Sequence, residues 1–112
     1  MAVSKEYYQS VMERLEPLGE VTGKTMFGGY GIFFRGLMFA VISDDVLYFK
    51  VDSTNLDDYE KAGSTKFPHG INYWEVPGEV FENNAILHEW AQESINIALE
   101  TAAKKAKKSK RK

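Results

Sequence analysis

The segment from Met26 to Val51 constrains the fold of this chain more than any other part of it. It consists of short apolar runs separated by two-residue corners, Arg35-Gly36 and Asp44-Asp45, and it opens with a glycine-rich stretch. Apolar runs of strand length joined by such corners are typical of tight β-hairpins. We therefore predict a compact antiparallel meander between Thr25 and Val51.

Two runs within this segment indicate how its strands are buried. Leu37–Ile42 is apolar throughout, as expected for a central strand that is covered on both faces. Val46–Val51 instead alternates, with one side formed by Leu47, Phe49 and Val51. Such alternation predicts a strand with one clearly buried face.

Apolar stripes predict a helix at each end of the chain. Ser4 can cap a first helix that runs to about Leu18, because apolar residues recur there every three or four positions. Asn84 is predicted to cap a long last helix, one side of which is lined by Leu87, Trp90, Ala91, Ser94, Ile97 or Ala98, and Thr101. Three more residues widen this stripe: Ile86, Ile95 and Leu99. The stripe can pack on the sheet or on a second copy, so a homodimer stays open.

A short helix and one further strand complete the predicted order. Asp52 and Ser53 are good N-caps for a helix through Ala62, which Gly63 closes. Ile71–Val76 is rich in residues that favour strands. The predicted order is α-β-β-β-β-α-β-α, an α+β fold in which the helices pack against one antiparallel sheet.

The charge of the chain is divided unevenly along its length. The chain has 112 residues, the size of one domain, and all sixteen acidic residues precede Lys104. Seven basic residues precede Lys104 as well, so residues 1–103 carry a formal charge of −9. The remaining seven positive charges lie in the last nine residues. We predict a globular domain over residues 1–103 and a basic tail over residues 104–112.

Composition also bears on the cellular compartment. The chain contains no cysteine, which fits a reducing environment, and no run approaches the roughly 18 apolar residues of a membrane span. Its N-terminus has an early Glu6 and an amphipathic pattern rather than a cationic leader followed by an apolar stretch. These features predict a cytoplasmic protein without a membrane partner.

The basic tail is the strongest local signal for a partner. Its positive charges can neutralise DNA phosphates without reading a sequence, and the candidate contacts are Lys104, Lys105, Lys107, Lys108, Lys110, Arg111 and Lys112. The alternative is a frayed helix end, because alanine and lysine favour helix and cations suit its C-terminus. Both interpretations remain open from the sequence.

The glycines at the start of the meander allow two interpretations. In the first, Gly28, Gly29 and Gly31 present backbone N–H groups to a phosphate or another small ligand. A dinucleotide site, however, needs a helix that opens directly after its glycines, and here Ile32-Phe33-Phe34 continues as a strand. The favoured interpretation is that the glycines permit positive φ at a strand corner. A small-molecule binder or enzyme at the Gly28–Gly31 corner is the weakest alternative.

No set of residues predicts catalysis, a metal or a cofactor. His69 and His88 are the only imidazoles, and neither has the converging donors that a metal or a catalytic triad requires. The many aromatic residues of the sheet favour a core over a base-stacking platform. Three of them are candidates for a surface that contacts a partner: Tyr30, Phe34 and Trp74.

Several motifs occur together in a recognisable order. Met26, Phe27, Gly28, Gly29, Tyr30 and Gly31 come first, and they are followed by Ser43-Asp44-Asp45, Leu47–Asp52, Asn55, Tyr59-Glu60, Gly63, Tyr73–Pro77 and Trp90-Ala91. Over about residues 5–103 this pattern resembles the N-terminal domain of the TfoX/Sxy family of bacterial competence regulators. The resemblance implies a regulator of DNA uptake that acts with a transcription activator of the cyclic-AMP receptor class.

Family members of this kind usually carry a second, C-terminal domain, and here we expect a stand-alone module that ends in the basic tail. The predicted function is therefore a non-enzymatic regulatory module that works through a protein partner, such as a transcription factor. The alternative is a nucleic-acid-binding accessory protein that uses the basic tail.

Overall fold

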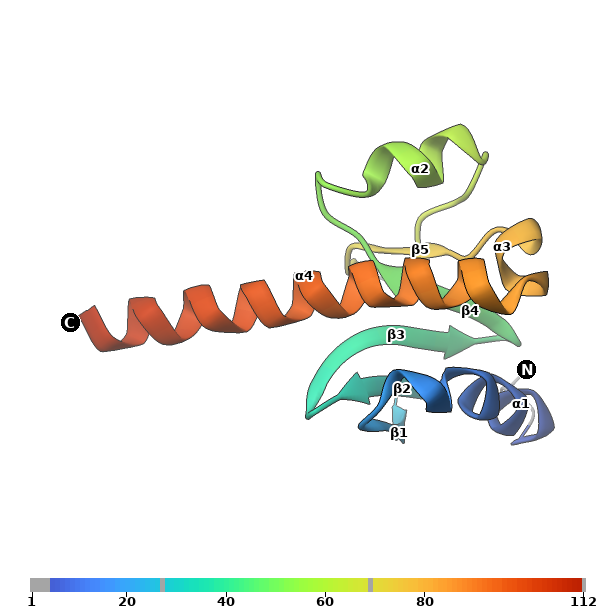
Figure 1. Ribbon diagram of the computed structural model, residues 1–112, viewed down its shortest axis with the longest axis horizontal. Helices are drawn as coiled ribbons and strands as arrows, with labels where there is room; N and C mark the ends of the chain where they lie inside the picture. The colour runs from blue at the N-terminus through green and yellow to red at the C-terminus, as the bar shows by residue number, and fades with distance from the viewer. Residues whose placement is uncertain (1–4, 27, 69, 112) are drawn as a thin grey trace.

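The computed structural model describes residues 5–26, 28–68 and 70–111, with side chains described as far as residue 105. Its elements follow in the order α1 (Lys5–Leu15), the 3-10 turn η1 (Glu16–Leu18), β1 (Val21–Met26), β2 (Gly29–Phe34), β3 (Leu37–Ser43), β4 (Val46–Lys50), α2 (Leu56–Lys61), β5 (Tyr73–Glu75), α3 (Gly78–Glu82) and α4 (Asn84–Arg111). The five strands form one antiparallel sheet in the order β1-β2-β3-β4-β5 (Figure 1). This arrangement confirms the predicted α+β fold, to which η1 and α3 are added.

Residues with positive φ form the two hairpin turns of the meander. Arg35 and Gly36 have φ values of 50° and 83°, and Asp44 and Asp45 have values of 53° and 58°. Two successive positive φ values match the right-handed twist of the strands on either side, so both predicted hairpins are confirmed. The first strand, however, begins at Val21 instead of Thr25. It is an edge strand with several exposed residues, and so it lacks a clear apolar alternation.

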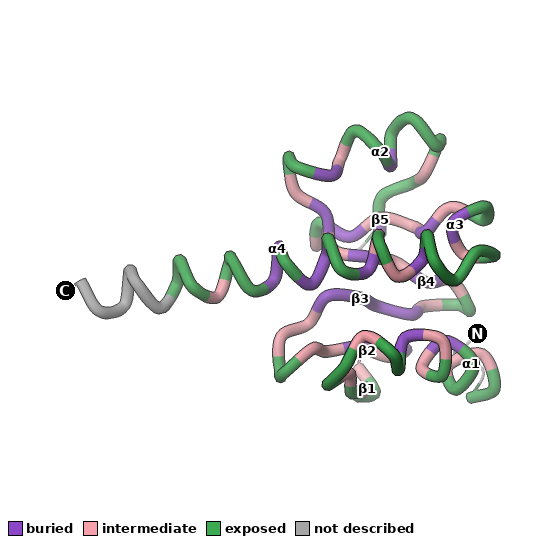
Figure 2. Tube along the Cα trace, viewed as in Figure 1, coloured by how far each residue is buried: buried purple, intermediate pink, exposed green. Residues whose placement is uncertain are grey.

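All the helices contribute to one core on one face of the sheet. α4 crosses β3 and β4, while α1 lies beside β1 and β2 (Figure 1). Buried residues of this core come from both terminal helices and the central strands (Figure 2), among them Val11, Leu15, Ile32, Phe39, Ile42, Leu47, Phe49, Tyr59, Leu87, Ala91 and Ile95. Segments at opposite ends of the chain therefore stabilise the same side of the sheet.

An irregularity in β3 turns extra apolar surface toward this core. Ile32 pairs with Ala40 and Phe33 pairs with Met38, so Phe39 is an additional residue opposite β2. Such a bulge bends the strand and re-aims its side chains. Both Phe39 and Ala40 are consequently fully buried in the main core.

Two predicted helix starts are wrong. α4 is capped by Asn83 rather than Asn84, because the Asn83 side-chain oxygen accepts the N–H of Ile86 at 3.2 Å. The short helix α2 begins at Leu56, because Asp52 instead accepts two hydrogen bonds from Thr54 within the preceding turn. At α4 the adjacent asparagine takes the cap, whereas the residue at the N-cap position of α2, Asn55, makes no side-chain capping bond.

The last strand and the last helix also differ in detail from the prediction. β5 has three residues, Tyr73–Glu75, instead of the predicted six. On α4, Ile95 is fully buried in the main core, whereas Thr101 is exposed although it was expected on the buried side. Ile86 and Leu99 each remain 38% exposed. The wide apolar stripe is thus used mainly within the chain.

One backbone oxygen joins the end of the meander to α2 and α4. Among the described residues, the buried polar side chains are Asn55 and Ser94, and both donate to the carbonyl oxygen of Lys50, at 3.3 and 2.7 Å. The Asn55 side-chain oxygen also accepts the N–H of Asp52 at 2.9 Å. These bonds fix the chain at the point where it leaves β4.

A glycine in β1 makes room for an aromatic pair that holds α1 on the sheet. Tyr8 of α1 stacks on Tyr30 of β2 with ring centroids 3.8 Å apart. A Cβ atom at Gly23 would collide with the Tyr8 hydroxyl and ring. The absence of a side chain at Gly23 therefore permits the stack.

We expect Gly23→Ala to lower the free energy of unfolding by about 1–3 kcal/mol, because Tyr8 must leave its place over Tyr30. Urea denaturation measures this loss. In a Tyr8→Ala background the same substitution should cost at least about 1 kcal/mol less, since the obstruction is gone. Gly78→Ala is the control, because a Cβ atom there meets nothing within 4 Å. An equal cost in both backgrounds would contradict the explanation.

We expect Asn55→Ala to destabilise the fold by about 2 kcal/mol and Ser94→Ala by about 1 kcal/mol. Loss of the Asn55 side chain leaves the Asp52 N–H without its acceptor, whereas loss of the Ser94 hydroxyl leaves the Lys50 oxygen with a remaining donor. Chemical denaturation of the two variants gives the ranking. Asn96→Ala, at an exposed position of α4, should change stability by less than about 0.5 kcal/mol. The opposite ranking of the two buried sites would exclude this account.

Candidate interaction surface

The face of the sheet that points away from the helices carries a second apolar cluster. Val41, Phe67 and Tyr73 are buried there, beneath the segment that leads into β5. Around them lie half-buried apolar side chains, which we call the outer face: Met26, Phe33, Met38, Tyr48 and Ile71. Among the described residues, no helix covers this side of the sheet (Figure 1).

Gly31 lies at the centre of the outer face. The sulfur atoms of Met26 and Met38 and the ring of Phe33 crowd the position that its Cβ would occupy. A side chain at Gly31 would therefore displace the methionines that cover β2. This close approach explains one glycine of the sequence motif in terms of surface packing.

The prediction of positive φ for the three motif glycines is correct for only one of them. Gly28 has φ = 73° at the corner between β1 and β2, as predicted, but Gly29 and Gly31 are ordinary strand residues. Since β2 follows the corner directly, no helix N-terminus faces it. Phe27, which belongs to the same motif, lies outside the described residues.

The three aromatics predicted to contact a partner are half-buried against the main core, on the helix-bearing face of the sheet. Tyr30 stacks on Tyr8, Phe34 lies under the Arg35 guanidinium at 5.2 Å from the ring centroid, and Trp74 donates to the Asn72 oxygen at 3.4 Å. Their role toward a partner remains a prediction.

The outer face was not predicted from the sequence, because its residues stand directly beside core residues in the chain. Phe33 precedes Phe34, and Tyr48 lies between Leu47 and Phe49. Strand alternation places neighbouring residues on opposite faces, so the pattern of β4 was sufficient to place Tyr48 on the face opposite Leu47 and Phe49. At Met38 the bulge at Phe39 interrupts the alternation, and an apolar run alone does not show which face stays open.

Burial keeps the phenols of the outer face protonated. Desolvation raises the pKa of Tyr73 to about 12, and its hydroxyl donates to the Met38 carbonyl oxygen at 3.1 Å. The pKa of Tyr48 is raised by burial and, to a lesser extent, by Glu75 and Asp44. The Lys50 ammonium lies 5.4 Å from the centroid of the Tyr73 ring. The outer face is therefore an apolar surface bordered by two described cations, Lys50 beside Tyr73 and Lys24, which pairs with Gly31 on the neighbouring strand.

The titratable groups singled out from the sequence have structural surroundings. His88 donates from Nε2 to the Arg14 carbonyl oxygen at 2.5 Å, which ties α4 to the end of α1. Burial, followed by repulsion from Asp58 and Glu89, raises the pKa of Glu93. Within the described ranges, no group of three or more His, Asp or Glu side chains is placed to hold a metal. His69 lies outside those ranges.

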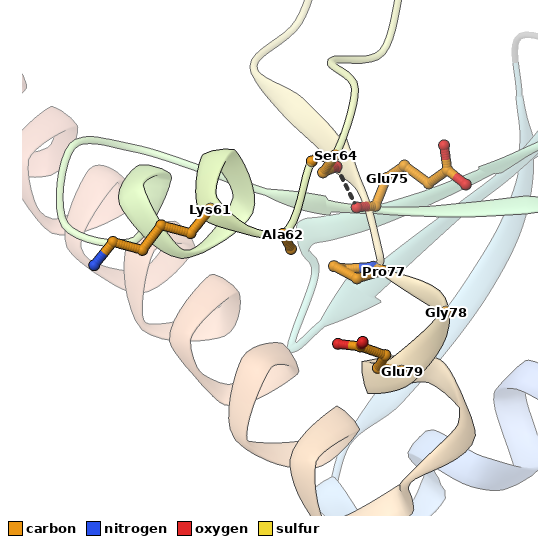
Figure 3. Close-up of a pocket in the computed structure, with 8 residues that line it drawn as sticks. Lys61, Ala62, Ser64, Glu75, Pro77, Gly78 and Glu79 are labelled. Carbon is orange, nitrogen blue, oxygen red and sulfur yellow. Dashed lines mark hydrogen bonds between the residues drawn. The ribbon is translucent and has the colours of Figure 1, made fainter.

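A hollow of about 490 Å³ lies between α2, β5 and α3. Figure 3 shows that the Lys61 ammonium and the carboxylates of Glu75 and Glu79 point in different directions around it. Ser64 donates to the Glu75 carbonyl oxygen at 2.6 Å, and Lys61 pairs with Asp57 at 3.1 Å. This open, polar hollow does not gather reactive groups at one point.

The predicted basic tail is the continuation of α4. The helix runs without interruption past residue 103 to Arg111, and Lys104 and Lys105 are exposed on it. The side chains of four other predicted contacts are outside the described part of the structure: Lys107, Lys108, Lys110 and Arg111. Lys112 lies outside it altogether. No described helix is long and apolar enough to cross a membrane.

Two comparisons relate this chain to known proteins. The family model of the TfoX N-terminal domain matches residues 13–98. The chain is also 32% identical over 106 residues to DNA transformation protein TfoX1 of Aliivibrio fischeri, an alignment that covers 87% of this chain and 50% of the relative. The chain thus spans about half the length of that relative. On these matches, this protein belongs to the TfoX N-terminal domain family.

Proposed function

We propose that this chain is a non-enzymatic regulatory module for DNA transformation, and that it binds a protein partner through the outer face. Support comes from its family and from its relative, which is a DNA transformation protein. The observation that carries the proposal is the half-exposed apolar cluster around Gly31, which no described helix covers.

The chemistry of the outer face suits a protein partner. Methionine side chains adapt their shape to an opposing surface, and aromatic rings provide large contact area. Met26 and Met38 flank Gly31, while Phe33 and Tyr48 supply the rings. The methionines and Phe33 carry no charge, and the raised pKa of Tyr48 keeps its phenol neutral. These four side chains therefore favour an apolar partner surface over a highly charged one.

The proposal of a module without catalysis follows from how its titratable groups are used. The imidazole of His88 is engaged with the backbone of α1, and Asp57 is paired with Lys61. In the polar hollow beside α2, the Ser64 hydroxyl donates to the Glu75 backbone oxygen instead of to a base. Binding is therefore the activity that the described side chains support best.

We propose a transcription factor as the partner, as the resemblance to competence regulators implies. Such a partner places the module in the cytoplasm, where the genes for DNA uptake are transcribed. The outer face then acts as the docking surface, and the helices on the opposite face maintain the shape of the sheet.

We expect the double variant Phe33→Thr/Met38→Gln to abolish regulation while the protein still folds. Threonine preserves the strand propensity and glutamine preserves the length of the methionine side chain, but the apolar contact is lost. The test is to delete the gene in its own host and complement it with the wild type or the variant. Transformation frequency and the transcripts of DNA-uptake genes are measured, with thermal unfolding as the check on folding.

Ile86→Ser is the matched control, because Ile86 is an exposed apolar residue on α4, away from the outer face. It should complement the deletion fully. If the double variant also complements fully, the outer face is not the docking surface. If deletion changes neither transformation nor transcription, the proposed function itself is wrong.

A further inference from the structure

The second half of α4 projects beyond the rest of the molecule (Figure 1). A helix of 28 residues is about 42 Å long. Its buried residues end at Ala98, and most described residues from Leu99 onward are exposed (Figure 2). The sheet therefore supports the first half of the helix and leaves the second half accessible from most sides.

The projecting half of α4 contains six of the fourteen lysine and arginine residues of the chain. Lys104 and Lys105 are exposed, and the sequence continues along the same helical backbone with Lys107, Lys108, Lys110 and Arg111. Positions three and four residues apart lie on one side of a helix. In the sequence Lys104, Lys107, Lys108 and Arg111 follow this spacing, so their backbone positions fall in a row on one side of α4.

The sheet adds one cation to this row. Lys50 of β4 and Lys105 of α4 line the same notch of about 160 Å³, where the helix leaves the sheet. Met38 also lines the notch, so the notch borders the outer face. Two lysines that are distant in sequence thus flank one surface depression.

We propose that the end of α4, together with Lys50 in the notch, binds the phosphate backbone of duplex DNA without reading its sequence. Duplex DNA carries a negative charge about every 1.7 Å along its axis, so a row of cations on one helix can neutralise several phosphates at once. Residues 1–103 carry a formal charge of −9, which repels DNA and directs it to the projecting end. This activity goes beyond the proposed protein-binding function and does not depend on it.

The competing occupant is the acidic surface of a second copy. Three carboxylates, those of Asp58, Glu89 and Glu93, lie together where α2 meets α4. Burial, followed by repulsion from Asp58 and Glu89, raises the pKa of Glu93. Three carboxylates provide far less charge than a duplex, and neutralising phosphates also releases condensed counterions. Charge density therefore favours DNA. Glu100, which is exposed one turn before Lys104, opposes this binding.

The test is fluorescence anisotropy of a labelled duplex of mixed sequence with the full chain, measured over a series of salt concentrations. We expect binding whose log–log salt slope is no steeper than about −7, from about 0.9 per cation that contacts a phosphate. The full-length variant Lys104→Gln/Lys105→Gln/Lys107→Gln/Lys108→Gln should reduce the slope by about 3–4 and weaken binding at least about tenfold at 50 mM salt.

Single substitutions separate the notch from the rest of the surface. Lys50→Gln should reduce the slope by about 1, whereas Glu100→Gln should strengthen binding. Lys61→Gln is the control, because Lys61 is an exposed lysine on α2 that pairs with Asp57. It should leave the slope and the affinity unchanged. Circular dichroism confirms that each variant keeps its helix content.

Three outcomes would overturn the proposal. The first is no binding by the full chain at about 50 mM salt, where phosphate contacts are strong. The second is binding that the quadruple variant retains, or that Lys61→Gln weakens as much as Lys50→Gln. The third is a salt-sensitive dimer, seen by sedimentation velocity, that the quadruple variant does not form and that does not bind DNA. In that case a second copy of the chain, and not DNA, occupies the basic end of α4.

Discussion

The carbonyl oxygen of Lys50 is the point on which the arrangement of the helices depends. It ends the meander and accepts hydrogen bonds from Ser94 of α4 and from Asn55 before α2. A buried carbonyl without partners is costly, and so is a buried amide or hydroxyl, so all three groups are satisfied only when both helices are in place. The long last helix is thereby held across β3 and β4.

This constraint also determines which surfaces remain open. With every helix on one face, the opposite face of the sheet is covered only by the segment that contains Phe67 and Ile71, as far as the structure describes the chain. The methionines around Gly31 fill part of that face. The outer face and the projecting end of α4 meet at the notch beside Lys50. A protein partner on the outer face and DNA on the end of α4 would therefore bind next to each other, on either side of this notch.

The predictions made from sequence succeeded where local chemistry is decisive. Asp44 and Asp45 occupy a two-residue corner that needs positive φ at both positions, and the chain adopts it. The cap of α2 failed because the Asp52 side chain bonds to Thr54 within the preceding turn, and the cap of α4 failed because two asparagines compete for it. Asn83 and Asn84 are adjacent, and only the path of the chain out of α3 selects Asn83. The first part of β1 was not predicted because it is an edge strand, and its solvent-exposed positions carry polar residues that break the apolar alternation.

The sequence by itself determined the strands of the meander, the two terminal helices and the separation of an acidic body from a basic end. Those features depend on residue periodicity, turn chemistry and charge, which act over a few positions. Only the tertiary structure decided that Met26, Met38 and Phe33 gather over Gly31, that Tyr30 and Trp74 face the helices, and that Lys50 lies beside Lys105. Those contacts depend on strand register and on the bulge at Phe39, which arise only when distant segments pack together.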